Sequence, residues 1–299
     1  MQAKHVELVT AIAEAGSLGA AALRLNKSQP ALSKALQAAE RDLGCQIFHR
    51  GPHGVVPTVE GERVVDRCRL ISRDLALLDE DIAQMQGGVH GTLNVVVSPF
   101  AAVKILPPVL TRFARRFPSV QVQVVGGHSS RAYQMLRARR ADFVIGPAPE
   151  PETTVGLRAR HLVSTSITIV TGDGSRYLTQ TSPEALQQAQ WLLIGPRERR
   201  ATFAAYFEAR GMQAPTPILC SDSILTILSM LEGTDLLCSF PTLLVRDVAR
   251  RWQIATLDLD FDFPEISISL TSELARVPTM AGLAFEDLVI EEAARLVNP

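Results

Sequence analysis

Two short helices joined by a tight turn are predicted between Ser17 and Gly44, and no other feature limits the fold of this chain as strongly. Ser17 can cap the helix that begins at "LGAAALRL", and Ser28 can cap the next one, because a serine hydroxyl accepts the free N–H groups of a first turn. Pro30 falls in that first turn, where its missing N–H costs little. Gly16 and Gly44 end the preceding and following helices. The pattern is typical of a helix-turn-helix.

The second helix of the pair has an apolar side and a polar side. Its apolar positions are Leu32, Ala35, Leu36, Ala39 and Leu43. On the other side, amide, hydroxyl and ammonium groups can bond base edges or phosphates in a major groove. A three-helix bundle with a solvated polar side is the alternative. The next stretch, "QIFHRGPHGVVPT", favours DNA binding over that bundle, because it predicts two short strands around a turn, which form a wing. The predicted DNA contacts are Lys27, Ser28, Gln29, Pro30, Ser33, Lys34, Arg50 and His53.

Charge sets a condition on this prediction. The formal net charge of the chain is −1, and its first sixty residues carry six Lys and Arg side chains against five Asp and Glu side chains. A general polycation is therefore excluded, and any contact with nucleic acid depends on where a few basic groups are placed.

The N-terminal segment resembles the winged helix-turn-helix of LysR-type transcriptional regulators. Two departures from that family are Ala39, where leucine is usual, and Pro57, which replaces an aliphatic residue. The elements that match, in order, are Gly16-Ser17, Ala21-Ala22, Leu25, Ser28-Gln29-Pro30-Ala31, Ser33, Glu40, Leu43-Gly44, Phe48, Arg50, Thr58 and Gly61. The resemblance implies a DNA-binding domain over residues 1–60 and double-stranded operator DNA as a partner.

A long helix follows, over residues 58–87, and carries an apolar seam. Spacings that alternate between four and three residues are typical of a coiled coil, so the seam predicts pairing of two copies of the chain. A helix packed on its own domain is the alternative. The seam positions are Val64, Cys68, Ile71, Leu75, Leu78, Ile82 and Met85. Dimerisation through such a linker is also what the family resemblance implies, together with a homotetramer and contact with RNA polymerase.

From residue 91 to 299 apolar strand patterns alternate with helical ones, which predicts an α/β domain with mainly parallel strands. The hydrophobic content of 46% is enough for such a core. By resemblance to LysR-type effector domains, this part is a two-lobed fold like that of type 2 periplasmic binding proteins. Lobe 1 is then roughly 91–163 plus 267–299, lobe 2 is roughly 164–266, and the ligand cleft lies between them.

Polar or turn-forming residues follow several predicted strands, where ligands bind in α/β folds. We expect them to surround a small anionic effector, with an aromatic carboxylate or a sulfonate as candidates. Plain turn and capping chemistry is the alternative reading of the same residues. The predicted effector contacts are Ser98, Pro99, Phe100, His128, Ser129, Ser130, Pro147 and Arg197. Ser98 is expected to donate a hydrogen bond beside free N–H groups of the helix that begins there.

Other functions are less well supported by the sequence. The chain has no GxSxG elbow, metal-binding motif or glycine-rich phosphate loop, so we predict neither an enzyme nor a metal or cofactor site. A redox-responsive regulator that uses Cys220 and Cys238 is the alternative function. Because no CxxC pair, secretory leader or membrane-spanning run is found, the sequence predicts reduced thiols and a cytoplasmic protein.

Overall fold

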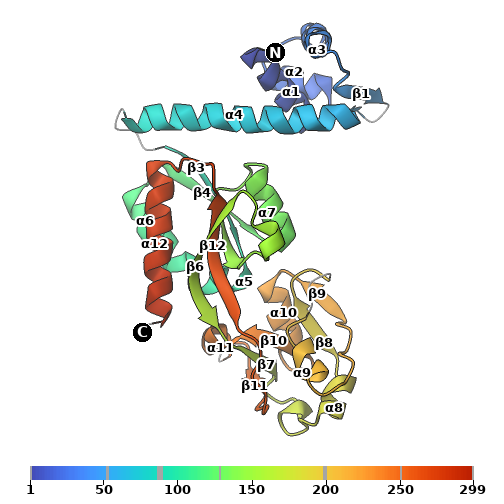
Figure 1. Ribbon diagram of the computed structural model, residues 1–299, viewed down its shortest axis with the longest axis vertical. Helices are drawn as coiled ribbons and strands as arrows, with labels where there is room; N and C mark the ends of the chain where they lie inside the picture. The colour runs from blue at the N-terminus through green and yellow to red at the C-terminus, as the bar shows by residue number, and fades with distance from the viewer. Residues whose placement is uncertain are drawn as a thin grey trace. The chain divides into compact units, whose positions relative to one another are not determined.

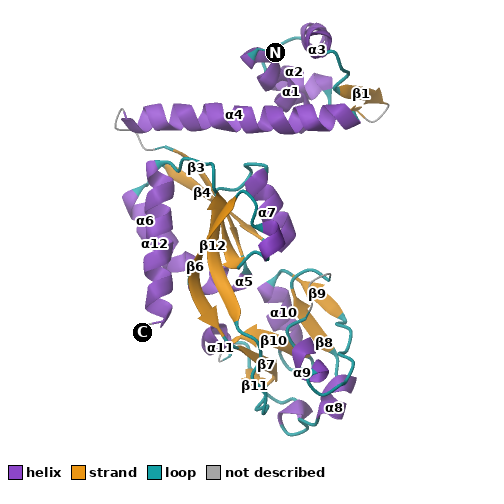
Figure 2. Ribbon diagram, viewed as in Figure 1, coloured by secondary structure: helices purple, strands orange, loops and turns teal. Residues whose placement is uncertain are grey.

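A computed structural model describes residues 2–51, 54–85, 90–127, 129–197, 201–249 and 251–297 of the chain. The chain divides into two compact units, Met1–Val89 and His90–Pro299. Figure 1 labels the elements of each unit along the chain, and Figure 2 separates helices from strands. The first unit is mostly helical, whereas the second contains two five-stranded sheets with helices around them.

Unit 1 contains the predicted helix-turn-helix and wing. Ser17 Oγ accepts from Ala20 N, and Ser28 Oγ accepts from Ala31 N at 3.4 Å, so both serines cap helices as expected. Gly16 and Gly44 adopt the left-handed conformation that ends a helix. The elements of this unit are α1 (Ala3–Ala15), α2 (Leu18–Arg24), α3 (Gln29–Leu43), β1 (Phe48–Gly51), β2 (Gly54–Pro57) and α4 (Val59–Met85).

The core of unit 1 is built from the apolar sides of all four helices. From α3 it takes Leu32, Leu36 and Ala39, which are fully buried. Ala39, the first departure from the family pattern, is thus an ordinary core residue. The start of α4 also enters this core through Val65 and Cys68, which fixes the first turns of the long helix against its own domain.

The segment Gln46–Phe48 is bonded on one side to α3 and on the other to the start of α4. From α3, Glu40 Oε1 accepts from Ile47 N at 2.9 Å and from Phe48 N at 3.2 Å. At the start of α4, Thr58 Oγ1 donates to Gln46 O at 2.7 Å and accepts from Gly61 N at 2.8 Å. Thr58 N also donates to Ile47 O. We call these contacts the wing junction; they connect α3, the wing and α4 directly.

Unit 2 consists of two lobes, each with its own sheet (Figure 2). The sheet of lobe 1 has the strand order β4-β3-β5-β12-β6. Helices α6 and α12 pack against each other, and Phe113 of α6 meets Phe285 of α12 at 5.5 Å between ring centroids. The elements of this lobe are β3 (Gly91–Val97), α5 (Pro99–Lys104), α6 (Leu106–Arg116), β4 (Val120–Gly126), α7 (Ser129–Arg137), β5 (Phe143–Pro147), β6 (Leu157–Thr165), β12 (Ile266–Glu273) and α12 (Met280–Val297).

The sheet of lobe 2 has the order β11-β7-β10-β8-β9. Trp191 stacks on Phe203 at 4.2 Å in the core of this lobe, with Phe207 edge-on to the indole. The chain enters lobe 2 between Thr165 and Ile167 and returns at Ile266. Its elements are β7 (Ile167–Gly172), α8 (Pro183–Gln188), β8 (Trp191–Ile194), α9 (Ala204–Glu208), β9 (Leu219–Ser221), α10 (Ile224–Leu231), β10 (Leu237–Pro241), α11 (Thr242–Val248) and β11 (Ile254–Thr256).

Both sheets are mixed, which differs from the mainly parallel arrangement expected from the alternation of elements. Strands β3, β4 and β5 pair in parallel, as do β8, β9 and β10. The strands next to the crossovers, β6, β7 and β12, form antiparallel pairs. The chain leaves the lobe 1 sheet, forms the lobe 2 sheet and then returns, so some strands run opposite to their neighbours. The alternation of helices and strands in the sequence does not predict which strands these are.

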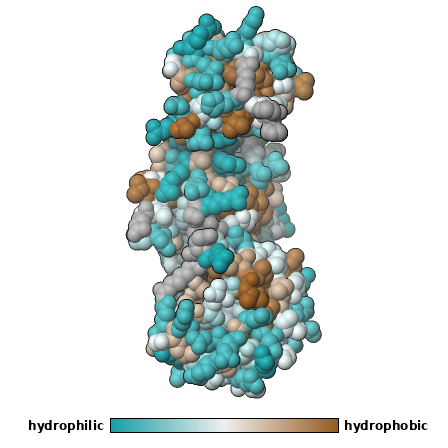
Figure 3. Space-filling view, turned by 90° about the vertical axis from the view of Figure 1, so that its right-hand side faces the viewer, coloured by the Kyte–Doolittle hydropathy of each residue, from teal (hydrophilic) through white to brown (hydrophobic). Residues whose placement is uncertain are grey.

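Ile218, Leu225 and Met230 are exposed apolar side chains on and beside β9 and α10 of lobe 2. Figure 3 shows brown surface on this lobe among mostly teal and white residues. Single exposed apolar side chains are ordinary on protein surfaces. Among the helices that the structure describes, none combines the length and apolar composition needed to cross a membrane.

Candidate functional site

The exposed side of α3 carries the residues predicted to contact DNA. Gln29, Pro30 and Lys34 are exposed and Ser33 is half-buried, while the opposite side of the helix is in the core. Lys27 and Ser28 are exposed just before the helix. The Ser28 oxygen is used in the cap, but its O–H can still donate to a phosphate or base. The N-terminal half of α3 and the two residues before it thus present hydrogen-bonding groups and the ammonium groups of Lys27 and Lys34, as a recognition helix requires.

The wing is described in part. β1 and β2 pair antiparallel, with Arg50 opposite Val55. Val55 N donates to Gly16 O at 2.8 Å, which attaches the wing to the end of α1. Gly54 has φ +123° and lies where a Cβ would be 2.4 Å from Gly16 O, so this close approach requires glycine. The side chain of Arg50 and all of His53 lie outside the described residues.

The predicted dimerisation seam has two parts. Val64 is packed against the core of unit 1 and Cys68 is fully buried in it. The alternative, packing on the chain's own domain, therefore describes the first turns of α4. Beyond them the seam is exposed. The exposed fractions are 43% for Ile71, 46% for Leu75, 54% for Leu78 and 45% for Ile82. The side chain of Met85 lies outside the described residues. The seam available to a second copy thus begins at Ile71.

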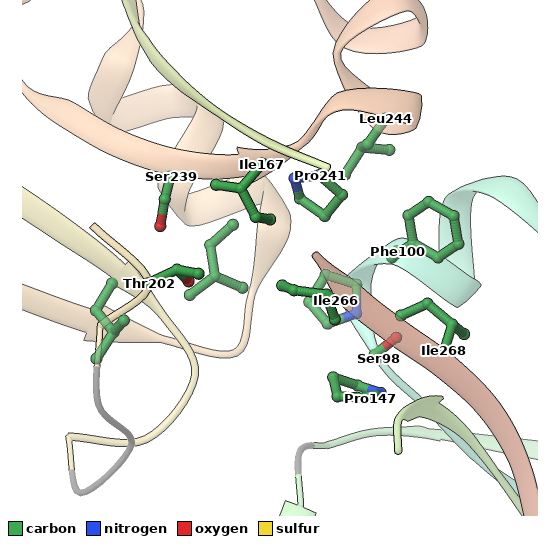
Figure 4. A pocket seen from close by; sticks show the side chains of 13 residues that line it. Ser98, Phe100, Pro147, Ile167, Thr202, Ser239, Pro241, Leu244, Ile266 and Ile268 are labelled. Carbon is green, nitrogen blue, oxygen red and sulfur yellow. The ribbon is translucent and has the colours of Figure 1, made fainter. Parts of the chain in front are cut away.

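A pocket lies between the two lobes of unit 2 (Figure 4). Its enclosed volume is about 40 Å³, and about 510 Å³ when the solvent-filled space at its open side is counted. Both crossovers reach it, through Ile167 and Ile266. Its lining consists of Ser98, Pro99, Phe100, Pro147, Ile167, Leu193, Ile194, Thr202, Ser239, Pro241, Leu244, Ile266 and Ile268.

Four of the predicted effector contacts meet in this pocket: Ser98, Pro99, Phe100 and Pro147. Arg197 is exposed and does not line it. His128 and the side chains of Ser129 and Ser130 lie outside the described residues. Within the described lining, no side chain carries a charge. The walls are mostly aliphatic, and three hydroxyl groups supply side-chain hydrogen bonds.

Ser98 is held firmly at the edge of lobe 1. It is 2% exposed, and its N–H donates to Ile145 O at 2.8 Å. Its Oγ accepts from Ala101 N at 3.3 Å, and its carbonyl accepts from Ala102 N. Pro99 has no N–H, so Phe100 alone offers a free backbone donor in this first turn. Fewer N–H groups therefore face the pocket than the sequence suggested. The hydroxyl proton of Ser98 remains able to donate.

Most of the lining on the lobe 2 side was not predicted from the sequence. Ile167 and Ile266 follow the crossovers directly, so the predicted lobe boundaries were a signal that could have located them. Ser239 and Leu193 are inside short buried strands, where the sequence gives no sign of a ligand site. Thr202 precedes α9 in a turn and has no distinguishing neighbour in sequence.

An ion pair joins the lobes beside the pocket. Lys104 Nζ of α5 is 2.6 Å from Asp247 Oδ2 of α11. Each partner is about one helical turn from a lining residue, Phe100 on α5 and Leu244 on α11. The lobes therefore contact each other at the pocket rim as well as through the crossovers.

The cysteine arrangement does not suit a redox switch. Cys238 pairs with Leu192, and Cys220 pairs with Leu193 on the other side of β8. One strand therefore separates the cysteines, which places their Cα atoms about 10 Å apart, beyond disulfide reach. Burial raises the pKa of the Cys238 thiol well above its usual value, so little reactive thiolate forms. Within the described residues, no group of three His, Cys, Asp or Glu side chains could hold a metal ion.

Comparison with known proteins gives consistent results for both units. Residues 3–62 match the family model "Bacterial regulatory helix-turn-helix protein, lysR family". Residues 86–294 match the model "LysR substrate binding domain".

Individual relatives are distant but cover much of the chain. The HTH-type transcriptional regulator GalR of Pseudomonas putida is 28% identical over 80% of this chain, and the match spans 60% of GalR. The SDS degradation transcriptional activation protein of a Pseudomonas species is 27% identical over 95% of this chain and 94% of that protein. Among solved structures, CbnR, a LysR family transcriptional regulator, is 20% identical, with a TM-score of 0.67, covering 98% of this chain and 99% of CbnR.

Proposed function

Because this chain belongs to the LysR family of transcriptional regulators, and not to a family of enzymes, we propose that α3 and the wing read operator DNA and that a small amphipathic acid bound between the lobes modulates that reading. The observation that carries the proposal is one pocket that receives four predicted contacts from lobe 1 and both crossovers. A ligand there touches both lobes and favours one arrangement of them over others.

Gln29 is the residue we propose as the main base reader. Replacing it with alanine removes a bidentate partner for adenine, so affinity for the specific operator should fall by about 1–3 kcal/mol. Gln29 is exposed at the start of α3, so folding should be unaffected. The measurement is gel retardation with a fragment from beside the protein's own gene and with an unrelated fragment. An equal loss on both fragments would contradict a base-reading role. Lys34→Ala is the comparison, since loss of a phosphate contact should weaken both.

We also propose that two copies pair through the exposed seam of α4, from Ile71 to Ile82. Four apolar side chains, spaced by alternating steps of four and three residues, form a stripe whose contact with water is unfavourable. A second α4 covers this stripe by knobs-into-holes packing. A two-fold dimer then reads a pseudo-palindromic operator. A homotetramer and contact with RNA polymerase stay predictions from the family.

The chemistry of the lining supports an effector with an apolar body. Phe100, Ile167 and Ile268 offer ring and aliphatic surface. Near Ser98, the hydroxyl proton and the Phe100 N–H can both donate, which suits one carboxylate, sulfonate or sulfate head. The relative named for SDS degradation makes an alkyl sulfate a sensible compound to test beside aromatic and aliphatic acids.

Calorimetry on Ser98 variants tests this site. With benzoate, octanoate and octyl sulfate as probes, we expect at least one to bind the wild type. Ser98→Gly should weaken it by about 1 kcal/mol, because the hydroxyl donor is lost while glycine still caps the helix adequately. Ser229→Ala, on the exposed side of α10, is the control and should bind as the wild type does. A bound probe should also change the DNA footprint. A probe that binds wild type and Ser98→Gly equally would remove Ser98 from the site.

A further inference from the structure

We infer that the lobe 2 end of the pocket recognises an uncharged hydrogen-bonding group, so that the effector is an acid with a hydroxyl or carbonyl group at its far end. The inference rests on the proposed function, in which the acidic head lies at Ser98. It concerns the opposite end of the same pocket, where Thr202 and Ser239 contribute the polar groups.

The hydroxyls of the pocket are divided between the lobes. Ser98 is on the lobe 1 side, whereas Thr202 and Ser239 are together on the lobe 2 side (Figure 4). Figure 4 also shows Ile167, Pro241 and Ile266 between these two ends. The lining is thus polar at each end and apolar in the middle, and a complementary ligand has the same order of groups.

The two hydroxyls on lobe 2 are available to a ligand. Ser239 is 8% exposed and Thr202 is half-buried. In the described part of the chain, neither hydroxyl makes a side-chain hydrogen bond, so each can donate to and accept from water or a ligand. A ligand group that bonds these hydroxyls takes the place of that water. A ligand without one leaves them unpaired and shielded from water, which costs binding free energy.

The group they recognise is uncharged. No cationic side chain lines this end within the described residues, and a second charge in the same apolar pocket would add its own desolvation cost to that of the acidic head. A serine or threonine hydroxyl can both donate and accept, so it suits a hydroxyl or carbonyl group. The ligand class is therefore hydroxy- or oxo-acids with an aromatic or aliphatic body.

Pairs of acids that differ by one hydroxyl test the inference on the full-length protein. The probes are benzoate against para-hydroxybenzoate and octanoate against ω-hydroxyoctanoate, measured by calorimetry. In at least one pair the hydroxy acid should bind the wild type roughly threefold to tenfold more tightly, the value of one net hydrogen bond. The double variant Thr202→Val, Ser239→Ala should lose this preference, because the plain acid then leaves no hydroxyl group unpaired. Ser229→Ala should keep the preference.

The outcomes separate this inference from the proposed function. If plain and hydroxy acids bind equally, and Ser98→Gly weakens both, the lobe 2 recognition is wrong while the effector site stands. If the double variant retains the preference, these hydroxyls do not produce it and the inference fails. If no acid of either pair binds, and octyl sulfate does not bind either, both the inference and the proposed effector class fail.

Discussion

Replacing Gly61 with alanine is expected to unfold or severely loosen the DNA-binding unit. A Cβ at this position would lie 1.8 Å from Ile47 O and 2.7 Å from Ile47 C, which are backbone atoms that cannot turn aside as a flexible side chain would. The substitution must separate α4 from the wing junction or displace Gln46–Phe48 from α3. We expect a loss of about 3 kcal/mol or more of stability, the upper range for overpacking.

Hydrogen exchange of the full chain measures this loss unit by unit. Peptides from α1 and α3 should exchange much faster in Gly61→Ala, whereas those of unit 2 should be unchanged. Gly51→Ala is the matched control, because among the described residues, chain neighbours aside, no atom would lie within 4 Å of a Cβ at Gly51. Equal protection of α3 in Gly61→Ala and wild type would mean that the junction is not a tight contact.

Leu75→Glu is expected to disrupt the proposed dimer through α4. Leu75 is in the middle of the exposed seam, so in a symmetric pair two carboxylates would enter one apolar layer. Burying an unpaired charge is costly, and we expect at least about 3 kcal/mol, or more than a hundredfold in the dimer dissociation constant. Affinity for a two-half-site operator should fall with it, because each monomer then binds one half-site alone.

Sedimentation of the variant tests the seam directly. Leu23→Glu is the matched control: it makes the same exchange at a leucine of α2 that is 81% exposed and outside the seam. The control should remain dimeric. If Leu75→Glu dimerises as strongly as the control, the coiled-coil interpretation of α4 is wrong.

The elements of unit 1 were predictable because short-range chemistry determines them. Serine caps at Ser17 and Ser28 and left-handed glycines at Gly16 and Gly44 act within one helical turn, and the structure has them as expected. The role of Glu40 was not predictable in this way. Its carboxylate bonds backbone groups seven and eight residues later, and this contact exists only once α3 and the wing are packed.

The seam and the pocket show two further limits of the sequence. Val64 and Cys68 continue the heptad spacing of Ile71 and Leu75, yet they pack within their own domain, because periodicity identifies an apolar face without identifying what covers it. In the pocket, the lobe 1 residues follow strand ends and were recognisable. Lobe 2 residues such as Leu193 and Ser239 are in strand interiors. The same amino-acid types occur there whether a residue lines a ligand site or belongs to the core, so the sequence does not distinguish the two.

The wing junction has a mechanical consequence. Since Thr58, just before α4, is bonded to the segment that Glu40 holds, we expect the first turns of α4, the wing and α3 to move together. A rotation of α4 then turns α3 and the wing together. The surface that we propose to contact DNA keeps its shape during this rotation. In a dimer, a rotation of the two α4 helices relative to each other would change the separation and tilt of the two α3 helices. In the dimer proposed above, we expect this change to alter which half-site spacings the two α3 helices can contact, in steps of about one helical turn of DNA.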